Sequence, residues 1–137
     1  MVAYNFQSQF EAALRSGDKA QTIRALGKRR HARPGEMVQV YIGMRTANCR
    51  LLFQSECIEA VPIIVQPFFG LDKCEPNRPY LFTPAHKVIL NGQALSIDEI
   101  HHLALADGFP DRHAFYQFFE DRLPFEGVLI RWQTPPF

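Results

Sequence analysis

The sequence is poor in cysteine, and no two of its cysteines have the spacing of a zinc or redox motif. The three residues, Cys49, Cys57 and Cys74, are odd in number and lie far apart. An odd count without a CxxC pair argues against both a disulfide framework and a zinc knuckle. We therefore expect reduced thiols in the core or near the surface.

The sequence also lacks a long apolar run and a secretory leader. No stretch approaches the roughly 18 apolar residues that are needed to cross a bilayer. The first residues, Met1 to Gln7, do not follow the charged-then-apolar order of a signal peptide. These absences predict a cytoplasmic protein that has no membrane partner.

Neither an internal repeat nor a linker divides the chain. With 137 residues and 47% apolar content, it is long enough to bury one ordinary core and short for two. A single domain over residues 1–137 is therefore expected. Residues 66–87 hold four of the ten prolines and are the least regular stretch.

Hydrophobic periodicity predicts the elements of the first half. Phe6, Phe10, Ala13 and Leu14 recur at helical spacing, which indicates a short amphipathic helix over residues 7–16. Gly17 then acts as a stop signal, because glycine adopts the left-handed conformation at little cost. Strands are expected at residues 21–25, 37–42, 50–58 and 62–65.

Turn and capping residues predict the second half. Asn91-Gly92 suits a hairpin turn that needs positive φ at both central positions. Ser96-Ile97-Asp98-Glu99 is a capping box, and its helix is expected to end near Ala106. A further helix over 111–121 and a strand over 127–132 follow. This order predicts an α+β fold, a β-barrel of about five or six strands with helices packed around its mouth.

The segment after Gly17 brings three polar groups within six positions. In an extended segment Thr22 and Arg24 share a face, while Lys19 must curl in through the turn. An ammonium, a hydroxyl and a guanidinium would then surround one cavity. A lysine with a lowered pKa can act as a general base, and a threonine as a nucleophile or hydrogen-bond donor. The alternative is a solvated Lys19 and an ordinary strand residue at Thr22.

Several segments in the same order resemble the ASCH domains, which are PUA-like β-barrels associated with RNA. The resemblance spans most of the chain, although residues 66–90 have no counterpart. It implies a barrel fold and a nucleic-acid partner. The matching segments are Gly17-x-Lys19-x-x-Thr22-Ile23-Arg24, Arg33-Pro34-Gly35-Glu36, Tyr41-Ile42-Gly43-Met44-Arg45-Thr46, Asp107-Gly108-Phe109 and Gly127-Val128-Leu129-Ile130-Arg131-Trp132.

The chain is also distantly similar to the bacterial acetylcytidine amidohydrolases within that family. Those relatives combine a lysine, a threonine and a glutamate, which implies catalytic roles for Lys19, Thr22 and Asp107. Aspartate is one methylene shorter than glutamate, so its carboxylate falls about 1.5 Å short of the same reach on an unchanged backbone. Asp107 could instead simply end one helix and help to start the next, because Asp and Gly suit such junctions.

A basic run follows the polar segment. Arg24, Lys28, Arg29, Arg30 and Arg33 are accompanied by no acid, and such a cluster attracts phosphates by counterion release. We therefore assign these five residues as candidate nucleic-acid contacts. The alternative is a solvated loop in which the charges have no partner.

Aromatic residues supply the remaining candidate contacts. Tyr41 and Arg45 flank Gly43-Met44, where a ligand can approach the backbone, and are expected to hold a base and a phosphate. The pairs Phe68-Phe69, Phe115-Tyr116 and Phe118-Phe119 could stack bases. Their helical spacing favours the core, and Phe115, Phe118 and Phe119 are expected to point inward.

The function that follows from these features is binding of RNA or a nucleotide. The alternative is a small hydrolase that acts on a modified nucleoside or on RNA, with Lys19, Thr22 and Asp107 at its centre. A third possibility is a protein-interaction domain that has lost nucleic acid. No cofactor is expected. His86, His101 and His102 do not form a metal set, because adjacent histidines on a helix point about 100° apart.

Overall fold

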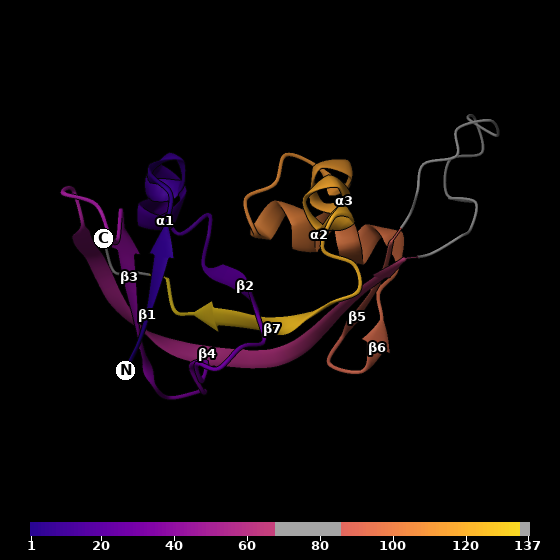
Figure 1. The fold of residues 1–137 in the computed structure, drawn as a ribbon, viewed down its shortest axis with the longest axis horizontal. Coiled ribbons are helices and arrows are strands. Elements are labelled where there is room, and N and C mark those ends of the chain that lie inside the picture. The colour runs from indigo at the N-terminus through magenta and orange to yellow at the C-terminus, as the bar shows by residue number, and fades with distance from the viewer. Residues whose placement is uncertain (68–85, 135–137) are drawn as a thin grey trace.

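The computed structural model describes residues 1–67 and 86–134, and these form one mixed β-sheet with helices on its concave side (Figure 1). The sheet has seven strands, β1 (Val2–Phe6), β2 (Gln21–Ala25), β3 (Met37–Ile42), β4 (Arg50–Pro67), β5 (His86–Leu90), β6 (Gln93–Ala94) and β7 (Phe125–Trp132). The helices are α1 (Glu11–Ser16), which follows a 3₁₀ turn at Ser8–Phe10, α2 (Ile97–Ala106) and α3 (Arg112–Glu120).

The predicted helices and the hairpin are confirmed. Ser96 and Glu99 form the capping box of α2, and Asp111 accepts a hydrogen bond from the Ala114 amide at the start of α3. Asn91 and Gly92 both have positive φ, at 50° and 82°, as the hairpin turn requires. These elements were predictable because their signals are local.

Two strands differ from the prediction. β1 was missed, although Val2, Tyr4 and Phe6 alternate as its buried residues, so Phe6 belongs to a strand and not to the first helix. β4 is one continuous strand that contains Pro62. The β4–β5 pairing ends at Ile63 and Leu90, and the Pro62 carbonyl accepts a hydrogen bond from the Asn91 amide just beyond that last pair. The N–H that proline lacks would therefore lie at the end of the β4–β5 ladder, where proline is tolerated.

β4 is the longest strand and joins the two halves of the sheet (Figure 1). Its first part pairs with β3, which pairs with β1 in parallel, and its second part pairs with β5 and β7. Among the described strands, β2 pairs only with β7. The sheet is strongly bent, but the pairings of the described strands do not by themselves close it into a barrel.

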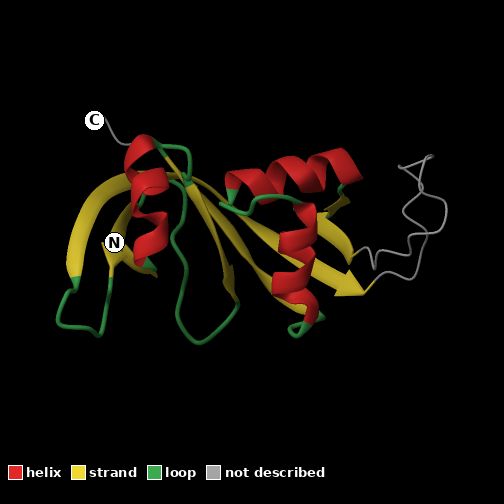
Figure 2. Cartoon of the chain, turned by 90° about the horizontal axis from the view of Figure 1, so that it is seen from above, coloured by secondary structure: helices red, strands yellow, loops and turns green. Residues whose placement is uncertain are grey.

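The hydrophobic interior falls into two clusters. One lies where β1 and β3 pack with α1, around Leu14 and Trp132. The other lies where the end of β4 packs with β5, α2 and α3, around Phe115 and Phe119. Figure 2 shows α1 over one half of the sheet and the pair α2 and α3 over the other. Lys19 and Asp107, which are described below, are members of neither cluster.

Some expectations concern single residues. Phe118 is 47% exposed, so the prediction that it packs inward is wrong, whereas Phe115 and Phe119 are buried as expected. Cys57 is a buried free thiol and Cys49 an exposed one. Cys74, Phe68 and Phe69 lie outside the described residues, as does most of the proline-rich stretch. Within the described ranges, the helices are all too short to span a membrane.

Candidate functional site

The site is built around Lys19, which is buried although it follows a surface helix. Gly17 ends α1 in the left-handed conformation, with φ of 88°, and the Lys19 amide then donates to the Ala13 carbonyl. This turn directs the side chain inward, as the sequence predicts, and leaves Lys19 only 4% exposed. Its ammonium lies over the rings of Phe6 and Phe10, 5.3 Å from the centroid of Phe10.

Asp107 meets Lys19 from the other half of the molecule. The Lys19 Nζ donates to the Asp107 carbonyl oxygen at 2.6 Å and lies 3.6 Å from its carboxylate Oδ1. Asp107 caps the end of α2, and Gly108 follows with φ of 99°. A Cβ at Gly108 would lie 3.3 Å from Phe10, so glycine also allows the close approach of this loop to the start of α1. The shorter acid therefore reaches the lysine.

Gln21 is a third member of this group that the sequence did not suggest. It is buried, and its Nε2 donates to Asp107 Oδ1 at 3.3 Å. The carboxylate is thus held by a cation and an amide from the same short segment. The sequence places Gln21 two residues after Lys19, which is the spacing of residues on one face of a strand. A single glutamine at the start of a strand is nevertheless too common to indicate a functional site.

Thr22 and Arg24 share a face of β2, as predicted. The Arg24 Nε donates to Thr22 Oγ1 at 2.9 Å, and its Nη2 donates to the Asn5 carbonyl at 2.7 Å. The guanidinium also lies over the rings of Tyr4 and Phe6, at 5.3 and 5.0 Å from their centroids. Because the hydroxyl of Thr22 accepts from Arg24, its own hydrogen can still be donated.

Burial makes the charges of the site unfavourable. It lowers the pKa of the Lys19 ammonium and raises the pKa of the Asp107 carboxyl, while the attraction between the two groups opposes both shifts. Burial also lowers the pKa of Arg24, and the positive charge of Arg24 lowers the pKa of Lys19 further. Each charge is therefore held in a place where it is less favourable than in water.

A small cavity lies on the Gln21 side of this group. It has a volume of about 220 Å³ and is bordered by Gln21, by Ala106 at the end of α2, and by Trp132 at the end of β7. Lys19, Thr22, Arg24 and Asp107 do not line this cavity, so it is not the one that the sequence predicts around Lys19, Thr22 and Arg24. Its volume is below the roughly 300–1,000 Å³ of pockets that enclose a drug-sized ligand. The cavity therefore suits one planar ring or a similar small group.

The residues of the basic run differ in their contacts: some are paired within the protein and others are exposed. Arg30 is paired with Glu36 through two hydrogen bonds of 2.6 and 2.8 Å, and this contact lowers the pKa of Glu36 to about 2. Arg29 donates to the Ala3 carbonyl and lies over the Tyr4 ring. Lys28 and Arg33 are exposed. The run is thus not a uniform cationic surface, because one member is neutralised and two are held against β1.

Tyr4 anchors the loop that carries this run. Its hydroxyl accepts from the Ala32 amide at 3.1 Å and lies 3.0 Å from His31 Nδ1, while His31 Nε2 bonds the Ala25 carbonyl at 2.9 Å. A carbonyl can only accept, so Nε2 carries the hydrogen, and in a neutral ring Nδ1 accepts from Tyr4. Arg24 on β2 and Arg29 in the loop thus both lie over the ring that fixes this loop.

Tyr41 and Arg45 have no contact with the Lys19–Asp107 group among the described residues. Tyr41 is opposite Asn5 in the β1–β3 pair and therefore points to the other face of the sheet from Tyr4 and Phe6. Arg45 is exposed in the turn after β3, with φ of 66°. A separate groove of about 810 Å³ borders this turn, lined among others by Asn5, Gly43 and Asn48.

His86 has a structural role, and the other two histidines considered above as metal ligands lie side by side on α2. His86 is buried, and its Nε2 bonds the Tyr116 carbonyl at 3.0 Å. His101 and His102 have ring centroids 6.1 Å apart on α2. In the parts of the chain that the structure describes, no three His, Cys, Asp or Glu residues are grouped as metal ligands.

Comparisons with known proteins add no assignment, because no family model, no curated protein and no solved structure matches this chain.

Proposed function

We propose that this chain is an ASCH-like domain that binds RNA or a nucleotide at the group formed by Lys19, Gln21, Thr22, Arg24 and Asp107. In this proposal the bent sheet corresponds to a PUA-like barrel. A base enters beside Gln21 and Asp107, whose amide and carboxylate match the donors and acceptors of a base edge. The phosphate lies near Arg24 and Arg29.

The observation that carries the proposal is the buried Lys19–Asp107 pair between two separate hydrophobic clusters. A buried ion pair is often no more stabilising than apolar side chains of the same volume. Ionisable groups whose pKa values are shifted by burial and by a charged partner are typical of functional sites. Stability alone therefore does not account for the presence of a lysine, an aspartate and an arginine at this boundary.

Calorimetric titration tests the proposal directly. Cytidine 5′-monophosphate and a short single-stranded RNA are titrated into the wild type, Lys19→Met and Asp107→Asn. Loss of one charge-assisted hydrogen bond should weaken binding about 10- to 100-fold. Arg15→Met is the matched control, because it removes an exposed ion pair with Glu11 on α1. Equal affinities in all four proteins would contradict the proposal.

The basic run gives a second expected result. Each phosphate contact with single-stranded RNA contributes about −0.7 to the slope of log affinity against log salt. Arg29→Ala should flatten this slope by about one contact. Arg30→Ala should leave it nearly unchanged, because Glu36 already compensates Arg30. The opposite pattern in a salt titration would place the phosphates along the outer part of the loop.

A second candidate function is hydrolysis of an acetylated cytidine, favoured by the lowered pKa of Lys19 and its 3.6 Å separation from Asp107. A neutral Lys19 would take the proton of Thr22 as its oxygen attacks the acetyl carbonyl. Breakage of the C–N bond would leave an acetyl-threonine ester and release cytidine, whose amino group receives that proton. Water would then hydrolyse the ester to acetate.

Lys19→Ala and Thr22→Ala separate the two candidate functions, because both should lower acetylcytidine hydrolysis a hundredfold or more. The Asp107 carboxylate already lies 3.6 Å from Lys19 Nζ, so Asp107→Glu tests whether hydrolysis needs a glutamate itself and not a longer reach. Release of cytidine is followed by chromatography. If the wild type and Asp107→Glu are both inactive while the nucleotide still binds, the hydrolase is wrong and the binding function stands.

A further inference from the structure

Phe118 is an exposed aromatic ring in a helix whose other phenylalanine and tyrosine rings are buried. It is 47% exposed, whereas Phe115, Tyr116 and Phe119 on α3 are at most 5% exposed. Single exposed apolar residues are common and by themselves carry no function. The neighbours of Phe118 are what distinguish it.

Those neighbours form a surface of stacked groups. The guanidinium of Arg122 lies 4.4 Å from the centroid of the Phe118 ring. The ring of Phe109 lies 5.6 Å away, and Phe119 contacts Phe118 edge to face at 5.0 Å. An aromatic ring held by its neighbours and accompanied by an arginine is the arrangement on which single-stranded nucleic acids stack their bases.

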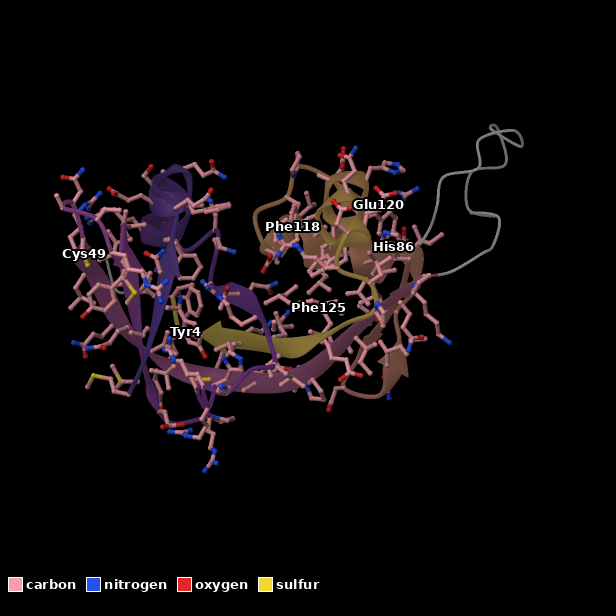
Figure 3. The ribbon with its side chains drawn as sticks, viewed as in Figure 1. Tyr4, Cys49, His86, Phe118, Glu120 and Phe125 are labelled. Atoms are coloured by element: carbon pink, nitrogen blue, oxygen red, sulfur yellow. The ribbon has the colours of Figure 1, made fainter. Side chains whose placement is uncertain are left out.

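The chain places this surface next to the proposed site. Phe109 follows Asp107 by two residues, so their Cα atoms are at most about 7.6 Å apart. Phe118 lies in the part of the helical layer nearer to α1 (Figure 3). Phe109 therefore connects the loop that carries Asp107 to the Phe118 ring, whose centroid lies 5.6 Å from that of Phe109.

We infer that Phe118, with Phe109 and Arg122, stacks the base adjacent to the one held at Asp107, so that the ligand is single-stranded RNA and not a free nucleoside. This inference rests on the proposed function. The occupant is a base because the surface combines a flat ring with a cation and is continuous with the loop that carries Asp107.

The test uses a short single-stranded RNA that contains 2-aminopurine, whose fluorescence is quenched by stacking. Phe118→Leu should weaken binding of this RNA about 5- to 100-fold, the effect of losing one base–aromatic stack, and should reduce the quenching. Phe118→Trp should retain both. Leu105→Ala, at an exposed apolar residue of α2, is the control. The affinity for cytidine 5′-monophosphate should be the same in all these proteins.

The outcomes separate the inference from the proposed function. If the wild type binds the mononucleotide and Phe118→Leu binds the RNA as tightly as the wild type does, the inference is wrong and the proposed function stands. If the wild type binds neither ligand, both are wrong. If Phe118→Leu abolishes self-association in sedimentation and leaves RNA binding unchanged, the ring serves a protein contact and the inference is overturned.

Discussion

Replacing Lys19 with methionine is expected to lower the free energy of unfolding by about 3 kcal/mol, the lower end of the cost of leaving one partner of a buried ion pair alone. Methionine fills a similar volume, but among the described residues the Asp107 carboxylate then keeps only the hydrogen bond from Gln21. Because burial already raises the pKa of Asp107, protonation limits the loss. Urea denaturation followed by circular dichroism measures the change.

The double variant Lys19→Met/Asp107→Asn makes this prediction specific. Asparagine keeps an acceptor for Gln21 and carries no charge, so the double variant should be more stable than Lys19→Met alone. Arg15→Met provides the comparison for a solvent-exposed pair and should change stability by no more than about 0.5 kcal/mol. A double variant that is less stable than the single one would mean that the charge of Asp107 is not the source of the loss.

The same pair predicts a pH dependence. The pKa of Lys19 is lowered in the folded protein, so the unfolded chain binds more protons between that lowered pKa and 10.5, the ordinary value for lysine. Stability rises with pH wherever the unfolded state binds more protons. The contribution of Lys19 therefore makes the wild type gain stability through this window, and Lys19→Met lacks that contribution.

Gly127→Ala is expected to have the second large effect, at or above the upper end of the roughly 1–3 kcal/mol typical of overpacking. A Cβ at this position would collide with the carbonyl oxygen of Arg24 and lie 2.7 Å from Cε1 of Phe125. The phenyl ring can move, but the carbonyl belongs to β2, which pairs with β7 at this point. β2 would have to shift and take Arg24 with it.

Gly27→Ala is the matched control, because no atom lies within 4 Å of the Cβ it would add. It should change the free energy of unfolding by a few tenths of a kcal/mol. Nucleotide affinity should also fall in Gly127→Ala, since Arg24 moves, and should stay constant in Gly27→Ala. Similar stability of the two variants would contradict the close packing of β2 on β7.

The predictable parts of this molecule are those set by local sequence. The capping box at Ser96, the stop at Gly17 and the Asn91-Gly92 turn each act within a few residues, and each element formed as expected. β1 was missed because five residues at the start of a chain give a weak alternating pattern. The continuity of β4 through Pro62 depends on where β5 ends, which the local sequence does not indicate.

The site was partly predictable for the same reason. The shared face of Thr22 and Arg24 follows from strand geometry, and the inward turn of Lys19 follows from Gly17. The pairing of Lys19 with Asp107 joins residues 88 positions apart, and only the family resemblance suggested it. The Arg30–Glu36 pair forms within the segment before β3, and its acid lies just beyond the basic run, so counting charges within the run could not reveal it. The opposite facing of Tyr41 depends on the β1–β3 pairing.

The most direct test is a nuclear magnetic resonance titration of the ¹⁵N-labelled wild type with cytidine 5′-monophosphate, because it needs no variant and reports every amide. We predict that the largest chemical-shift changes fall on residues 17–24 and 106–109, the two segments that meet at Lys19 and Asp107. Changes confined to the turn after β3, or no changes at millimolar ligand, would contradict a nucleotide site between the two hydrophobic clusters.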